Sequence, residues 1–175
     1  MKIKSFALIA AVTAAGFLSA QSANAADEWG IEYEEKARVE AKVVDLLCEV
    51  TGDCVEQCGA GTRQLGLLLD DGTLVPAVKN FDPFAGTTDD LIQFCGKRIV
   101  ADGLMIKDPL MPMFVVQFRR LAPDGEWGRA NNFTKNWAKS NPDKPANQWF
   151  RHDAEVLRLV ETQGVYGIPG LKAEE

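Results

Sequence analysis

Four cysteines are the side chains of this 175-residue chain with the most evident chemistry: Cys48, Cys54, Cys58 and Cys95. An even number of cysteines predicts two disulfides if the chain folds in an oxidising compartment. Four cysteines can pair in three ways, and the sequence alone does not choose among them. A bond from one loop cysteine to Cys95 is slightly favoured over Cys54–Cys58, because a disulfide within one helical turn needs adjusted geometry.

A copper site is an alternative use of the same sulfurs. Cys54 and Cys58 have the Cys-x-x-x-Cys spacing of Sco-type copper chaperones, and Met111 and Met113 could add thioethers. Thiolate and thioether ligands select Cu(I). Sco-type sites, however, lie on a thioredoxin fold and use a distant histidine, and methionines more often fill cores or loops. A redox-active dithiol is a further alternative. The primary prediction is structural cross-links with no metal or other cofactor.

Aromatic side chains are concentrated after residue 122, and they are the second candidate site. The six are Trp127, Phe133, Trp137, Trp149, Phe150 and Tyr166. One interpretation is that they pack on the rest of the domain and complete its core. The other is that part of this surface docks on another protein, since Trp and Tyr are favoured interface anchors.

The remaining polar residues do not suggest catalysis. The single histidine, His152, has Asp153 as its neighbour, but adjacent residues of a helix point in different directions, so a surface or capping role is expected. Asp70-Asp71 and Asp89-Asp90 are expected at a turn and at a helix start. No glycine-rich phosphate loop or serine-nucleophile motif is present. The sequence therefore predicts a protein that is not an enzyme.

Short strands are the elements expected to position these residues. Alternating apolar and charged residues from 38 to 47 predict a strand ending at Cys48. The Asp-Gly step in residues 70–73, between two apolar runs, predicts a β-hairpin. A short helix over 88–95 and strands over 97–106 and 112–121 follow. This order predicts an OB-like, five-stranded antiparallel barrel, in a mainly β protein with α additions.

The sequence changes character at Ala122. Phe133 and Trp137 are four residues apart, as on one face of a short helix that stops at Asn141-Pro142. A second helix is expected between Asp153 as its cap and Gly164 as its stop. The predicted domain organisation is a leader (1–25), an N-terminal segment (26–37), the barrel (38–121) and a helical, aromatic-rich extension (122–175).

Residues 1–25 have the features of a cleavable secretory signal peptide. Lys2 and Lys4 precede an apolar run, and Ala23-Asn24-Ala25 ends it with the small-x-small pattern that signal peptidases cut. Cleavage is expected after Ala25, with the mature protein in the periplasm. Loss of the two lysines takes the formal net charge from −6 to −8. Nucleic-acid binding is not expected of so acidic a chain, and no membrane insertion is expected after cleavage.

The strings VVDLLC, GLLLDDGTL and FCGKRIVADGLM resemble a broad, largely uncharacterised group of small exported bacterial OB-fold proteins. The matching positions are Val43, Val44, Asp45, Cys48, Cys54, Cys58, Gly66, Leu67, Leu68, Asp71, Gly72, Gly96, Lys97, Val100 and Gly103. The resemblance spans residues 38–120 and implies an exported binding or accessory domain without catalytic residues to carry over. Cys95 and the extension after Ala122 depart from the pattern.

These observations predict a non-catalytic periplasmic accessory, assembly or small structural subunit. It would dock on a larger protein complex, and a redox or respiratory complex is the expected host. A copper-binding or thiol-redox protein and a small-ligand or glycan-binding OB module are the alternatives.

Overall fold

A computed structural model describes residues 26–79, 86–168 and 170–171 of the chain. The predicted signal peptide, residues 1–25, lies outside the described residues. Within the described part, no helix is both long enough and apolar enough to cross a membrane.

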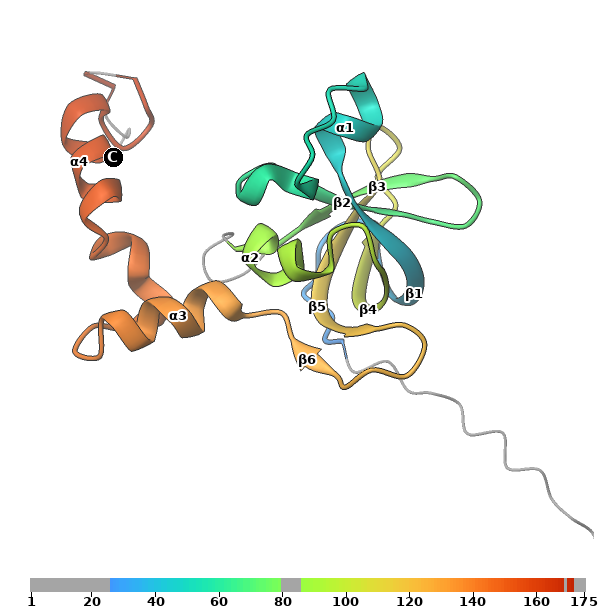
Figure 1. Ribbon diagram of the computed structural model, residues 1–175. Helices are drawn as coiled ribbons and strands as arrows, with labels where there is room; N and C mark the ends of the chain where they lie inside the picture. Colours follow the sequence, from blue (N-terminus) through green and yellow to red (C-terminus); the bar gives the residue numbers. More distant parts are fainter. Residues whose placement is uncertain (1–25, 80–85, 169, 172–175) are drawn as a thin grey trace, which may run out of the picture.

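Five strands close into a small β-barrel (Figure 1). They are β1 (Glu34–Asp45), β2 (Leu65–Leu68), β3 (Leu74–Val78), β4 (Arg98–Ile106) and β5 (Met113–Leu121). The sheet order is β3-β2-β1-β4-β5, and pairing of β3 with β5 joins the two ends. Closure pairs the first residues of β5 with β3, and the later residues of β5 keep an edge that β3 leaves unpaired. The predicted OB-like barrel is therefore confirmed as a closed five-stranded barrel.

The barrel is mixed, and the prediction of a wholly antiparallel one is wrong in this respect. Four of the five pairings are antiparallel, but β3 and β5 run parallel, with Ala77 opposite Phe114. The cause is the connection between β3 and β4. A crossover that includes a helix brings the chain to the far side of β1, so the last strand meets β3 in the same direction.

The first strand starts earlier than the predicted boundary at residue 38. β1 begins at Glu34 and pairs with β4 from Glu34↔Ile106 to Lys42↔Arg98. Its later half also pairs with β2, for example Val43 with Leu67. One strand that serves both neighbours must be long, and the strand therefore extends into the N-terminal segment.

The barrel interior is filled by one main cluster of apolar side chains from all five strands, from the helix that follows β3 and from Ala130 near the start of the C-terminal extension. Its buried members are Ala41, Val43, Leu65, Leu67, Val75, Ala77, Leu91, Ile99, Ala101, Phe114, Val116 and Ala130. The pairing of β4 with β5 has a β-bulge at Asp102 and Gly103. A Cβ on Gly103 would lie 1.9 Å from the Val115 carbonyl oxygen. The close approach of the two backbones at this bulge therefore excludes any residue larger than glycine.

A helix replaces the predicted end of the first strand. α1 (Leu46–Thr51) starts directly after β1, so Cys48 lies in a helix. The Asp45 carboxylate caps it by accepting the backbone N–H groups of Leu47 and Cys48, and Gly52 ends it in the left-handed conformation. These are strong helix signals, and they override the apolar run that suggested a strand.

The hairpin and the helix after it are confirmed. Leu69 and Thr73 are hydrogen-bonded across the turn between β2 and β3, and Gly72 has a φ of 85°. α2 (Thr87–Leu91) and the 3₁₀ turn η2 (Ile92–Phe94) occupy the predicted helical stretch. The helix starts at Thr87 with Gly86 as its cap, rather than at Thr88 or Asp89.

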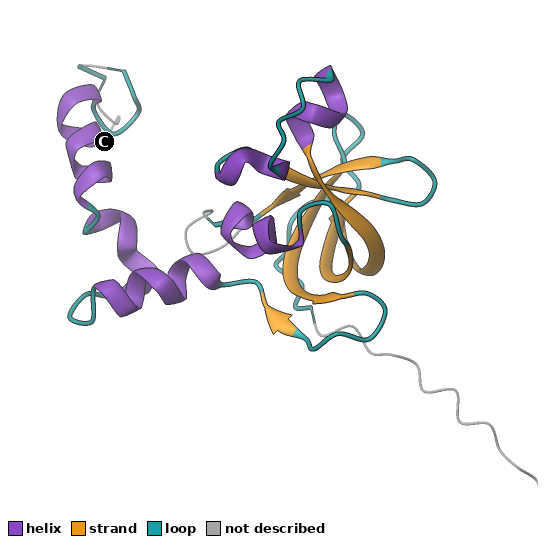
Figure 2. Cartoon of the chain, in the orientation of Figure 1, coloured by secondary structure: helices purple, strands orange, loops and turns teal. Residues whose placement is uncertain are grey.

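The C-terminal extension is helical, as predicted, and lies to one side of the barrel (Figure 2). A two-residue strand, β6 (Gly128–Arg129), first pairs with β5. α3 (Asn132–Ser140), the 3₁₀ segment η3 (Ala146–Arg151) and α4 (Ala154–Gln163) follow. Asp153 caps α4 and Gly164 ends it. The start of α3 is held against α2, where the Asn132 backbone N–H donates to the Asp90 carboxylate.

Candidate functional site

The four cysteines form two disulfides, Cys48–Cys54 and Cys58–Cys95. The first joins α1, which contains Cys48, to the loop that follows it. The second joins η1 (Cys58–Gly61), in the glycine-rich loop, to the residue that follows η2. The prediction of two disulfides is confirmed, including the preferred bond from a loop cysteine to Cys95. Both bonds stabilise the region where the loop, η2 and the barrel meet.

The geometry does not favour the copper alternative. Cys54 and Cys58 belong to different disulfides, so neither sulfur is a thiolate. Met113 starts β5 opposite Ile106, at the end of β1 remote from α1, and Met111 is exposed in the adjoining loop. In the part of the chain described, no group of three or more His, Cys, Asp or Glu side chains could hold a metal ion.

Three of the six predicted aromatic residues pack on one another. Phe133 and Trp149 meet edge to face with ring centroids 4.7 Å apart, and Phe150 lies 6.3 Å from Trp149. Trp137 is buried on the same helix as Phe133. The ring contacts of Phe133, Trp149 and Phe150 hold α3 to η3, so these side chains and the buried Trp137 are largely enclosed rather than forming an open surface.

The other two aromatic residues lie elsewhere. Trp127 stands between two guanidinium groups, with Arg38 5.1 Å and Arg120 4.9 Å from its ring centroid. Tyr166 is exposed after α4. His152 ends η3 by donating its backbone N–H to the Trp149 carbonyl, which agrees with the predicted capping role. The six aromatic residues therefore do not form one docking surface.

An aliphatic stripe on α4 is the exposed apolar surface that the sequence analysis missed. None of the helix residues is buried, and Leu157, Leu159 and Val160 are exposed. The apolar surface continues into Val165 and Tyr166, which are also exposed. The helical spacing of Val156, Leu157 and Val160 was visible in the sequence, but the exposure of this surface was not, because an apolar stripe normally faces a core.

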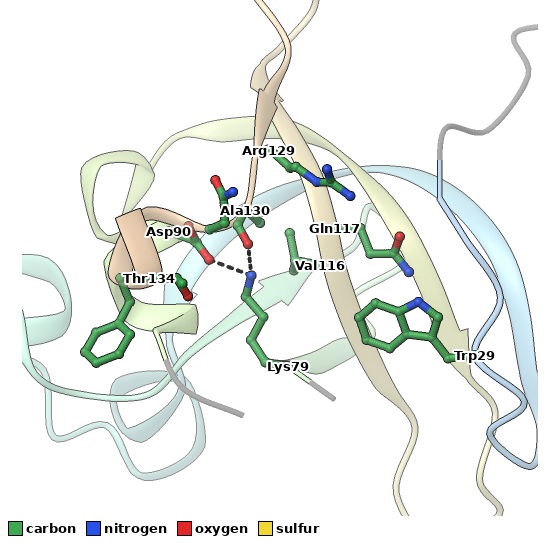
Figure 3. A pocket seen from close by; sticks show the side chains of 10 residues that line it. Trp29, Lys79, Asp90, Val116, Gln117, Arg129, Ala130 and Thr134 are labelled. Carbon is green, nitrogen blue, oxygen red and sulfur yellow. Dashed lines mark hydrogen bonds and ion pairs between the residues drawn. The ribbon is translucent and has the colours of Figure 1, made fainter. Parts of the chain in front are cut away.

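A cavity of about 260 Å³ opens between β5, β6 and the start of α3 (Figure 3). Lys79 and Asp90 lie on one side of it, while Trp29 and Gln117 lie across from them. Val116 lines it between the two sides, and Arg129 adds a second cation. A pocket with an indole wall and several polar groups can bind a small polar molecule.

A buried ion pair forms one side of this cavity. The Lys79 ammonium lies 2.7 Å from the Asp90 carboxylate and also donates to the Ala130 carbonyl. Asp90 is 1% exposed and accepts the Asn132 backbone N–H at 2.8 Å. Its carbonyl accepts the Nε–H of Arg119; burial lowers the pKa of that guanidinium, and the charge of Asp90 opposes the shift. These contacts tie α2, β3, β5 and the start of α3 together.

Asp90 lies in the first turn of α2, as predicted, and its side chain also joins α2 to Lys79 after β3 and to the start of α3. Asp102 is a second buried carboxylate, fully inaccessible within β4 and bound by Arg38. A sequence signal existed for Asp102, because it interrupts the apolar run 99–106. Charged residues are rarely buried unless paired, so an acidic residue inside such a run indicates a partner.

Comparison of the chain with protein-family models, with curated proteins and with solved structures finds no match. The sites described above therefore rest on their own geometry. Three features remain for a functional interpretation: the cross-linked loop region, the apolar stripe of α4 and the cavity beside Lys79.

Proposed function

We propose that the protein is a non-catalytic, exported accessory subunit that docks on another protein through α4. The single observation that supports this most is the exposed aliphatic stripe of that helix. Leu157 is 50% exposed, and Leu159 and Val160 are each 38% exposed. Burying such side chains contributes about 25 cal/mol per Å² of apolar area, so a partner with an apolar groove would gain by covering them.

The charge pattern of α4 suits insertion of a helix into a groove. Glu155 and Arg158 form an ion pair away from the aliphatic stripe, with their closest atoms 2.5 Å apart. One polar face and one apolar face, with the anchors Leu157 and Val160 three residues apart, fit this recognition mode. Because α4 packs mainly on η3 and stands off the strands (Figure 1), the stripe is presented outward.

Export is the second part of the proposal. The leader-like residues 1–25 and the two disulfides both suit an oxidising compartment such as the periplasm. A periplasmic redox or respiratory complex is the host that we propose for the docked subunit.

Site-specific photo-crosslinking tests the docking proposal. A photo-reactive residue at Leu157 should crosslink to one discrete protein in the exporting cell, whereas the same residue at Leu110 should not. Leu110 is a matched control because it is apolar and 96% exposed but lies outside the extension. Purified partner should then bind Leu157→Ser/Val160→Ser at least ten-fold more weakly than Leu110→Ser, as loss of central anchors requires. Equal affinities, or crosslinks only between copies of this chain, would contradict the proposal.

A second candidate function is the binding of one acidic sugar unit in the cavity beside Lys79. The observation that favours it is the combination of the Trp29 indole with the cations Lys79 and Arg129 around one small cavity. Glucuronate should quench tryptophan fluorescence and glucose should do so more weakly, and Trp29→Ala should abolish the response. An unchanged response in Trp29→Ala would exclude this cavity as the site.

A further inference from the structure

The carboxylate of Asp102 is held on both oxygens inside the barrel wall. Its Oδ2 accepts the Nε–H of Arg38 at 2.8 Å and a second N–H of the same guanidinium at 2.5 Å. Its Oδ1 accepts the backbone N–H of Ala26 at 3.1 Å. Asp102 is 0% exposed and Ala26 only 2% exposed, so the nitrogen of residue 26 is buried directly against a buried charge.

Gln117 holds the next residue, Asp27, and so helps to position the nitrogen of Ala26. Its side-chain oxygen accepts the backbone N–H of Asp27 at 2.9 Å, and its amide nitrogen donates to the Asp27 carbonyl at 2.7 Å. Gln117 is the extra residue of the β5 bulge, since Phe118 and Val116 pair with Asp102 and Gly103. A bulge changes the direction of the side chain it contains. Here it allows an amide side chain to hold residue 27 as a neighbouring strand would.

The same nitrogen adjoins the bond that the leader prediction marks for cleavage. Ala23-Asn24-Ala25 precedes it, with the expected cut between residues 25 and 26. Hydrolysis of that bond turns the amide nitrogen of Ala26 into an α-amino group and adds water to the leader as a new carboxylate. The amine is protonated near neutral pH, because α-amino groups have pKa values of about 8.

We infer that the α-ammonium group of Ala26, released by cleavage of the leader, becomes the second cation of Asp102. This inference rests on the export part of the proposed function. The ammonium faces Oδ1, whereas the Arg38 guanidinium grips Oδ2, so the carboxylate stands between the two cations. Charge-assisted hydrogen bonds are about twice as strong as neutral ones, and the burial of this site reduces screening by solvent.

Cleavage of the leader changes the charge on the nitrogen of Ala26. The precursor has one neutral amide donor there, whereas the processed chain has a charged group. Processing therefore stabilises the barrel, and the precursor is the less stable of the two forms. Removal of the leader and completion of the fold are coupled through one atom, the nitrogen of Ala26.

Two protein forms test the inference without requiring export. One starts at Ala26, after removal of a fusion partner, and the other carries a single glycine before Ala26. The glycine-extended form keeps the amide donor but moves the amine outward. The form that starts at Ala26 should melt about 3–6 °C higher, as expected when an ion pair replaces a neutral hydrogen bond in a domain of this size. An equal or lower melting temperature would overturn the inference.

Asp102→Asn should remove the difference between the two forms. If that variant does not fold, amine labelling of the unsubstituted forms gives the second measurement. With trinitrobenzenesulfonate under native conditions, the α-amine of Ala26 should react at least ten-fold more slowly than that of the added glycine. Equal labelling rates of the two α-amines under native conditions would contradict the ion pair with Asp102. N-terminal sequencing of the exported protein tests the cleavage separately. A start other than Ala26 would refute cleavage between residues 25 and 26, whereas the melting temperatures of the two forms test the ion pair itself.

Discussion

The ion pair of Lys79 and Asp90 links several elements at one side of the cavity. Asp90 receives the Asn132 amide and faces the Lys79 ammonium, and its own backbone carbonyl binds Arg119. Burying two charges is costly, and the attraction between them repays that cost only when both stay paired. The pair is therefore sensitive to loss of either partner.

Asp90→Asn should destabilise the fold strongly. The variant keeps an oxygen for the Asn132 amide but turns an NH₂ group toward the Lys79 ammonium, which places donor against donor. We expect a loss of about 3 kcal/mol in the free energy of unfolding, as for other broken buried pairs, measured by urea denaturation. Asp89→Asn is the matched control and should change stability by less than about 0.5 kcal/mol, because Asp89 is exposed. A loss of similar size in the control would contradict this assignment.

Local sequence signals could not reveal that Asp90 is buried. Asp89 and Asp90 look alike in the sequence, and both suit a first helical turn. Only the crossover from β3 and the return of α3 decide that Asp90 faces inward while Asp89 faces solvent. Asp102 was more predictable than Asp90, because its place in an apolar strand already required a buried partner.

At the scale of elements, the two disulfides close loops of very different length. Cys48 and Cys54 are 6 residues apart, whereas Cys58 and Cys95 are 37 apart and join η1 to the end of η2. A cross-link removes more conformational freedom from the unfolded chain when its loop is longer. The Cys58–Cys95 bond is therefore the more important of the two for stability.

Replacing each cysteine pair by serine should show this order. We expect Cys58→Ser/Cys95→Ser to lower the free energy of unfolding by about 4 kcal/mol, and Cys48→Ser/Cys54→Ser by about 2 kcal/mol. Urea denaturation without reductant measures both, and each double variant serves as the control for the other. Equal losses, or the reverse order, would show that native contacts of α1 outweigh the effect of loop length.

The strand order was predictable because hairpin signals and apolar alternation are local, whereas other elements depended on tertiary context. The Asp71-Gly72 turn indicated the β2–β3 hairpin from sequence alone. α1 was missed because Leu46 and Leu47 continue an apolar run, although Asp45 and Gly52 were valid helix caps. β6 has two residues and forms only because β5 offers it an edge.

The whole molecule divides into a barrel that folds around its own core and an outer arm that contributes little to that core. The division lies within the extension rather than at its start. Asn132 and Phe133 contact the barrel side, since the Asn132 amide binds Asp90 and a Cβ on Gly86 would lie 2.3 Å from Phe133. α4 has no buried residue. Stability and docking should therefore separate between α3 and α4.

Truncation at two points tests this separation. A chain that stops after Asp153 loses α4 and the tail, and should unfold within about 0.5 kcal/mol of the full chain because no buried contact is lost. A chain that stops after Asn131 also loses the amide donor to Asp90 and the Phe133 contact, and should lose about 2 kcal/mol or more. Neither chain should bind the purified docking partner, whereas the full chain should. A large loss of stability on removal of α4 alone would mean that its aliphatic stripe supports the fold, and docking through α4 would then lose its main argument.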